Sequence, residues 1–60
     1  MTTAAKARAA SYKAARQAIG TQHAVAKLLG VARSTVARRE AGAMPVTREA
    51  MLAMTYLVLP

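Results

Sequence analysis

The segment 21–42 limits what this chain can fold into more than any other, because it contains two short helical patterns that meet at one glycine. Apolar residues recur at helical spacing on both sides of Gly30, from Val25 to Val36. Thr21 is suited to cap the first helix, and Gly30 can end it in the left-handed backbone conformation that other residues resist. Two helices joined by so short a turn form a helix-turn-helix, whose second helix can lie in a DNA major groove.

The same segment contains eight residues that together form a specific pattern, with no insertion or deletion between them. These are Thr21, Gln22, Ala26, Leu29, Gly30, Val31, Val36 and Glu40. In this pattern the chain resembles the Cro-type (XRE) helix-turn-helix family of small phage and bacterial transcriptional repressors. The resemblance implies an all-α fold, a small bundle of four to five helices with a lambda-repressor-like DNA-binding arrangement. We expect one domain over residues 1–60, with the motif at 21–42.

The composition predicts a small core. Sixty residues allow one domain of modest stability. Although 55% of the residues are hydrophobic, 16 residues are alanine, and the chain has neither Trp nor Phe. A core this thin commonly needs support from a partner subunit.

The net charge of +7 is unevenly distributed. After residue 42 only Arg48 and Glu49 are charged, and they cancel, so the basic charge lies in the first two-thirds of the chain. This division predicts that one part of the chain faces a polyanion and that the other packs against protein. The absence of cysteine excludes disulfides and fits a reducing compartment. With no signal-peptide core and an apolar run at 51–59 too short to span a bilayer, we expect a cytoplasmic protein of a bacterial host cell, away from membranes.

An alanine-rich first helix is expected up to Ile19, with Thr2 and Thr3 as candidate caps. Its cations either form a solvated face or contact phosphates. We expect Lys13 on this helix, and Lys27 on the next, to contact the DNA backbone.

The first turn of the second helix offers backbone N–H groups and a dipole that favour an anion. Gln22 lies there, and the family resemblance implies that it anchors the DNA backbone or contacts a neighbouring base; the alternative is a plain polar residue. His23 is the only histidine and has no second metal ligand at suitable spacing, so we expect a backbone contact and no metal.

The third helix carries the candidate base-contacting residues on one side. Arg33, Ser34, Ala37 and Arg38 share an arc of the helix, while Val36 points the other way. An arginine can donate two hydrogen bonds to guanine, so Arg33 and Arg38 are the first candidates for base contacts. Ser34 could contact a base or phosphate, and Ala37 a thymine methyl group. The family's base-contacting positions match Arg33, Ser34 and Arg38.

We expect this helix at about 32–41. Two of its residues depart from the family pattern. Ala32 stands where Ser or Thr commonly caps the helix, a loss of about 1 kcal/mol. Arg39 stands at a usually apolar position, where its stem can cover the core edge while its head reaches a phosphate. Thr35 is a further candidate for backbone contact.

Glu40 keeps the family identity at its position. The resemblance implies a structural salt bridge between Glu40 and an arginine of the first helix, for which Arg16 is the best candidate. We therefore expect a structural rather than a catalytic role for this carboxylate.

After a loop at 42–46, Thr47 is a candidate cap for a last helix at about 47–58. Its apolar stripe is broader than one small core can cover, and Leu52 and Leu59 widen it. This predicts a two-fold dimer interface; the alternative is that the stripe belongs to the chain's own core. The predicted interface residues are Met51, Met54, Thr55, Tyr56 and Val58.

The leading functional hypothesis is a homodimeric, sequence-specific transcriptional repressor on a pseudo-palindromic operator of double-stranded DNA. The resemblance implies control of a short phage or mobile-element operon, often including the repressor's own gene. It covers phage Cro-like repressors, antitoxin regulators and anti-CRISPR-associated repressors, and the sequence does not choose among them. A non-specific nucleic-acid binder and a cationic membrane-active peptide remain as alternatives.

Catalysis is not expected. The sequence has no Cys, one His and two acidic residues, and it lacks a glycine-rich phosphate loop. No cofactor is expected, and a chain this short has no room for a domain that senses a small-molecule ligand.

Overall fold

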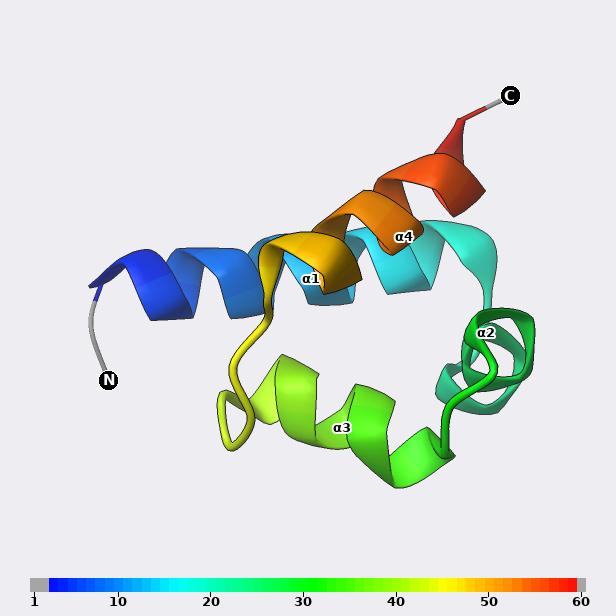
Figure 1. Ribbon diagram of the computed structural model, residues 1–60, viewed down its shortest axis with the longest axis horizontal. Coiled ribbons are helices and arrows are strands. Elements are labelled where there is room, and N and C mark those ends of the chain that lie inside the picture. The colour runs from blue at the N-terminus through cyan, green and yellow to red at the C-terminus, as the bar shows by residue number, and fades with distance from the viewer. Residues whose placement is uncertain (1–2, 60) are drawn as a thin grey trace.

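The chain folds into four α-helices in the computed structural model, which describes residues 3–59 (Figure 1). The helices are α1 (Thr3–Ile19), α2 (Gln22–Leu29), α3 (Arg33–Ala41) and α4 (Arg48–Val58). No strand occurs within 3–59, so the predicted all-α class is confirmed. The candidate cap Thr2 lies outside the described residues, and Thr3 is the first residue of α1 itself.

The helix ends follow from local side-chain and backbone chemistry. The hydroxyl oxygens of Thr21 and Thr47 each accept a hydrogen bond from the amide three residues further on, at 3.1 and 3.2 Å. Gly30 and Gly42 end α2 and α3 with φ of 72° and 79°, in the left-handed region where a Cβ is strained. Ala32 precedes α3 without a side-chain cap, as expected.

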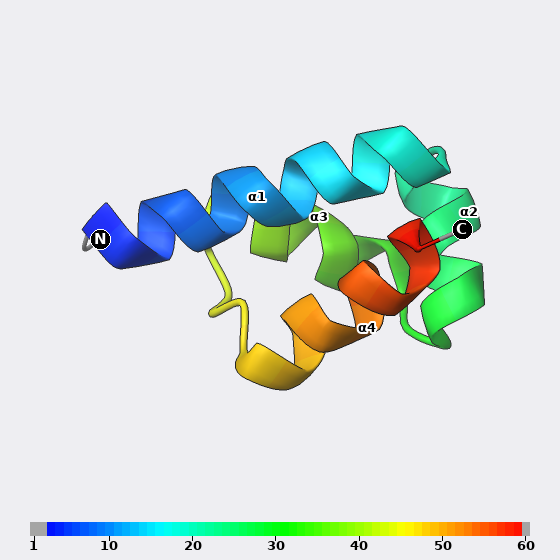
Figure 2. The same cartoon turned by 90° about the horizontal axis from the view of Figure 1, so that it is seen from above.

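The four helices wrap around one small centre. α1 and α4 run in the same general direction, and α3 runs back beneath α1 (Figure 1). α2 crosses the end of this group and is seen nearly end-on in Figure 1 and from the side in Figure 2. The main contacts join α1 with α4, α2 with α3, and α1 with α3. α3 is therefore held from two sides, by α1 and by α2.

The core draws on all four helices and on the loop before α4. Its largest fully buried side chain is Tyr12 of α1. Val36 of α3 is also fully buried, which anchors the inner side of that helix. The buried cluster consists of Tyr12, Val25, Ala26, Val36, Val46, Ala50 and Met54.

The predicted place of Met54 in a dimer interface is wrong. Its side chain is 0% exposed and lies in the core of its own chain. Ala50 and Met54, one turn apart on α4, both face inward, and Met51 is half-buried against the same core. The alternative of an intramolecular core therefore holds for this part of the stripe. A helical stripe wider than the core leaves only its outer edge exposed, and here that edge includes Tyr56.

Within residues 3–59, no helix is both long enough and apolar enough to cross a lipid bilayer.

Met54→Ala is expected to lower the free energy of unfolding by about 2–5 kcal/mol, because it leaves a cavity in a fully packed core. Leu28→Ala is the matched control, since Leu28 is 61% exposed on α2 and its truncation should change stability by less than about 0.5 kcal/mol. Urea denaturation followed by circular dichroism measures both. Equal losses in the two variants would contradict the placement of Met54.

Candidate nucleic-acid interface

The predicted base-contacting residues lie together on the outer side of α3. Arg33, Ser34 and Arg38 are exposed, and Ala37 between them is half-buried. Val36 on the opposite side is fully buried, so the core fixes which side of α3 faces outward. α3 follows α2 after a connection of only residues 30–32, which limits the angles that the two helices can adopt. The structure therefore brings the predicted base-contacting residues together on one surface.

The predicted ion pair between Arg16 and Glu40 is present and is bidentate. Arg16 donates from Nε to Glu40 Oε2 at 2.8 Å and from Nη2 to Glu40 Oε1 at 2.9 Å. Its third nitrogen, Nη1, donates to the carbonyl oxygen of Gly20 at 3.2 Å. The two side chains are 14% and 5% exposed, so water competes little for these bonds. The pair joins α1 to the last turn of α3.

Gln22 extends this pair to the outer surface of α3. Its Nε2 donates to Glu40 Oε1 at 3.3 Å, and its Oε1 accepts a hydrogen bond from Arg33 Nη1 at 3.1 Å. One line of hydrogen bonds therefore runs from Arg16, through Glu40 and Gln22, to Arg33. The link between Gln22 and Arg33 was not foreseen from the sequence, because nothing in the spacing of two polar residues on different helices indicates it. We name these four residues the Arg16–Arg33 network.

The network keeps Glu40 ionised. The hydrogen bond from Arg16 lowers the pKa of Glu40 most, against the opposing effect of partial burial, and the bond from Gln22 and the charge of Lys13 lower it further. The same bond raises the pKa of Arg16. The carboxylate is thus a permanent acceptor at neutral pH.

Arg39 points toward protein rather than away from it. Its Nη1 donates to the Tyr12 hydroxyl at 3.1 Å, and its guanidinium carbon lies 5.7 Å from the centroid of the Tyr12 ring. Its Nε is buried and has no hydrogen-bond partner among the described residues. The expected cover of the core edge by this side chain is present. The predicted phosphate contact would require the guanidinium to leave Tyr12.

The other residues predicted to contact the DNA backbone lie on three helices. Lys13 on α1, and His23 and Lys27 on α2, are exposed. Thr35 on α3 is half-buried. The three basic or ionisable side chains are accessible to a polyanion, and Thr35 is less so.

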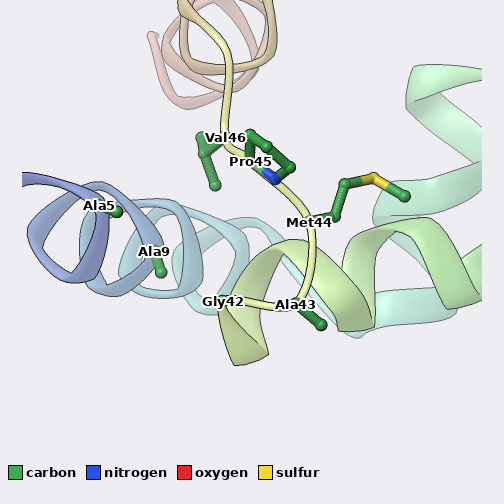
Figure 3. A pocket seen from close by; sticks show the side chains of 7 residues that line it. All are labelled: Ala5, Ala9, Gly42, Ala43, Met44, Pro45 and Val46. Carbon is green, nitrogen blue, oxygen red and sulfur yellow. The ribbon is translucent and has the colours of Figure 1, made fainter. Parts of the chain in front are cut away.

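A separate pocket of about 350 Å³ lies between the first half of α1 and the loop before α4 (Figure 3). It is lined by Ala5, Ala9, Gly42, Ala43, Met44, Pro45 and Val46. These side chains are small or apolar and none is titratable, so the pocket offers no groups for acid–base or metal chemistry. Within residues 3–59, no group of three or more metal-binding side chains comes together either.

The stability of the fold should decrease in acid because of Glu40. A carboxyl group whose pKa is lower in the folded state stabilises that state above its unfolded pKa, and this stabilisation is lost as the pH falls through the folded value. Unfolding by urea, measured from pH 7 to pH 3, should therefore become easier from about pH 5 downward. Glu40→Gln should be less stable at pH 7 by about 1–3 kcal/mol and nearly independent of pH over this range.

The control for this experiment is Glu49→Gln, which removes the other acidic residue of the chain, an exposed one in the first turn of α4. This variant should keep most of the wild-type pH dependence. If it abolished that dependence while Glu40→Gln retained it, the role given to the ion pair would be wrong.

No protein-family model matches the chain, and comparisons with the curated proteins and with the solved structures give no significant match.

Proposed function

We propose that the protein is a sequence-specific DNA-binding repressor that acts as a homodimer. The observation that carries the proposal is the exposed basic face of α3, which follows a three-residue turn from α2 and is anchored from behind by Val36. This arrangement has the properties of a helix-turn-helix, with α3 as the recognition helix in the major groove. The resemblance of segment 21–42 to Cro-type repressors supports the same function.

In this proposal Arg33 and Arg38 contact base edges. Each can donate two hydrogen bonds to O6 and N7 of a guanine. Ser34 contacts a base or a nearby phosphate, and Ala37 packs against a thymine methyl group. Val36 does not take part directly; its burial keeps the arginines directed outward.

The DNA backbone is held mainly from α1 and α2. Lys13, His23 and Lys27 are exposed there, and Gln22 lies in the first turn of α2, where the helix dipole favours a phosphate. These contacts fix the orientation of the protein on the duplex but carry no sequence information. Arg39 is left out of this set because its guanidinium lies on Tyr12.

The partner of α4 in the proposal is a second copy of the chain. Large apolar side chains remain uncovered on this helix and just after it: Leu52, Tyr56, Val58 and Leu59. Residues 50–60 include no charged side chain, so two copies with a net charge of +7 each can meet there without burying like charges. A two-fold axis at this surface would pair each face with itself, as dimeric repressors on pseudo-palindromic operators require. The centre of this interface is Tyr56 rather than Met54.

The protein represses transcription by occupying its operator. Two recognition helices enter successive major grooves about one helical turn apart and block access of the polymerase to the promoter. The resemblance implies a short phage or mobile-element operon in a bacterial cytoplasm, regulated by a Cro-like, antitoxin-type or anti-CRISPR-associated repressor.

One observation favours a second candidate, a non-specific nucleic-acid binder. The basic charge is not confined to α3, since α1 and α2 also carry exposed cations such as Lys6, Lys13 and Lys27. Such a protein would bind with the same dependence on salt but without preferring any sequence. Affinities for a preferred sequence and for random duplex separate the two.

Arg33→Ala and Arg38→Ala are each expected to weaken binding to the preferred sequence by about 5- to 150-fold and binding to random duplex only slightly. The preferred sequence is obtained by repeated selection from a random duplex library with the wild-type protein, and affinities are measured by fluorescence anisotropy at fixed salt. Arg48→Ala is the matched control, because it removes the same charge from an exposed position at the start of α4. Equal losses on both DNAs would make the two arginines phosphate contacts.

Tyr56→Asp should convert a dimer into a folded monomer. Tyr56 is 77% exposed, so the substitution adds a charge to the proposed interface without disturbing the core. Sedimentation equilibrium gives the mass, and circular dichroism checks the fold. Leu28→Asp introduces the same charge on the exposed side of α2 and should leave the dimer intact. A wild-type protein that sediments as a monomer at micromolar concentration would contradict this interface.

A further inference from the structure

The pocket between α1 and the loop before α4 has walls that are fixed by their own backbone bonds (Figure 3). Ala5 and Ala9 lie about one turn apart on α1, so the helix holds one wall in place. On the other wall, the amides of Ala43 and Met44 both donate to the carbonyl oxygen of Arg38, at 2.9 and 3.3 Å. Because the walls are already formed, a ligand would not have to order them on binding.

The pocket is apolar and is not filled by the side chains around it. Its volume of about 350 Å³ falls at the lower end of the range of pockets that bind small molecules. The α1 wall consists of two methyl side chains, where longer residues would fill the space. At its inner end Val46 is 6% exposed and belongs to the core. An occupant would therefore bury an apolar group here.

Cations surround the mouth of this apolar pocket. Lys6 and Arg8 are exposed on α1, and each is next in sequence to one of the two wall alanines. Neighbours on a helix are turned by about 100°, so the two cations flank the wall on opposite sides. Arg48 is exposed at the start of α4, and the one carboxylate of these two segments is Glu49. Three cations against one carboxylate leave a positive surround, which is complementary to an anion.

We propose that this pocket binds a small amphipathic anion, namely a carboxylic acid with a single short alkyl chain. The chain lies against the alanine wall and Val46, and the carboxylate stays at the mouth with Lys6 and Arg8. Such a site needs no separate sensing domain. It does not rest on the proposed function, because none of its lining residues belongs to the exposed basic side of α3. Its loop wall, residues 42–46, joins α3 to α4, so the ligand would contact the connection between these helices.

The test is an NMR titration of the ¹⁵N-labelled protein with octanoate, without DNA. Amide shifts should be largest at Ala5, Ala9 and residues 42–46 and should saturate with a dissociation constant of about 0.1–1 mM. 1-Octanol has the same chain without the charge and should bind about 2- to 10-fold more weakly, because it loses the attraction of the exposed cations. Acetate has the charge without the chain and should not shift these amides.

Two variants fill the pocket from opposite walls. Ala5→Leu on α1 and Ala43→Leu on the loop should each weaken octanoate binding by at least about 10-fold, because the added side chain occupies the space of the alkyl chain. Using both walls guards against one variant that fails to fold, and circular dichroism checks each. Ala7→Leu is the control, because it makes the same change at an exposed position on the other side of α1. It should bind as the wild type does.

The role of the charge is tested separately. The double variant Lys6→Gln, Arg8→Gln should bind octanoate no more tightly than 1-octanol, and its affinity for 1-octanol should be unchanged. If the wild type bound both molecules equally well, the preference for an anion would be wrong.

Three further results would overturn the site itself. The first is a wild type whose pocket amides do not shift with octanoate at millimolar concentration. The second is binding that persists in both Ala5→Leu and Ala43→Leu, which would place the ligand elsewhere. The third is a protein that ignores octanoate but binds vesicles of phosphatidylglycerol, which would indicate a lipid surface as the partner. None of these results bears on DNA binding, so the proposed function stands or fails by its own tests.

Discussion

The bidentate ion pair between Arg16 and Glu40 is the contact on which the candidate interface depends. It joins residues of α1 and α3 that are 24 positions apart in the sequence, at the edge of a small core. Because Arg16 satisfies both carboxylate oxygens, Glu40 stays ionised where an unpaired carboxylate would be costly. Val36 fixes the rotation of α3 from within, and the ion pair fixes it from the side.

The small size of the core also accounts for two other features of the molecule. The core cluster contains one aromatic residue, Tyr12, and the guanidinium of Arg39 lies over its ring. On α4 the inner edge of the apolar stripe is used up by the core, and the outer edge around Tyr56 stays exposed. A partner subunit at that edge would add the buried area that the single chain lacks. In this view, dimerisation would also increase the stability of the fold.

Local signals in the sequence were sufficient for the helices and their ends. The caps at Thr21 and Thr47 and the stop at Gly30 depend on residues within one turn, so they could be predicted. The side of α3 that faces outward also followed from helical periodicity. What could not be predicted depends on tertiary contacts. Periodicity does not distinguish a stripe that faces the chain's own core from one that faces a partner, and Met54 was misplaced for that reason.

The most direct test of the account is an NMR titration of the labelled protein with its selected duplex, in which every backbone amide and arginine side chain is followed at once. The largest shifts should occur at Arg33, Ser34 and Arg38 on α3, with intermolecular contacts to base protons of the major groove. Shifts confined to α1 and α4, with α3 unchanged, would contradict the claim that α3 recognises DNA sequence.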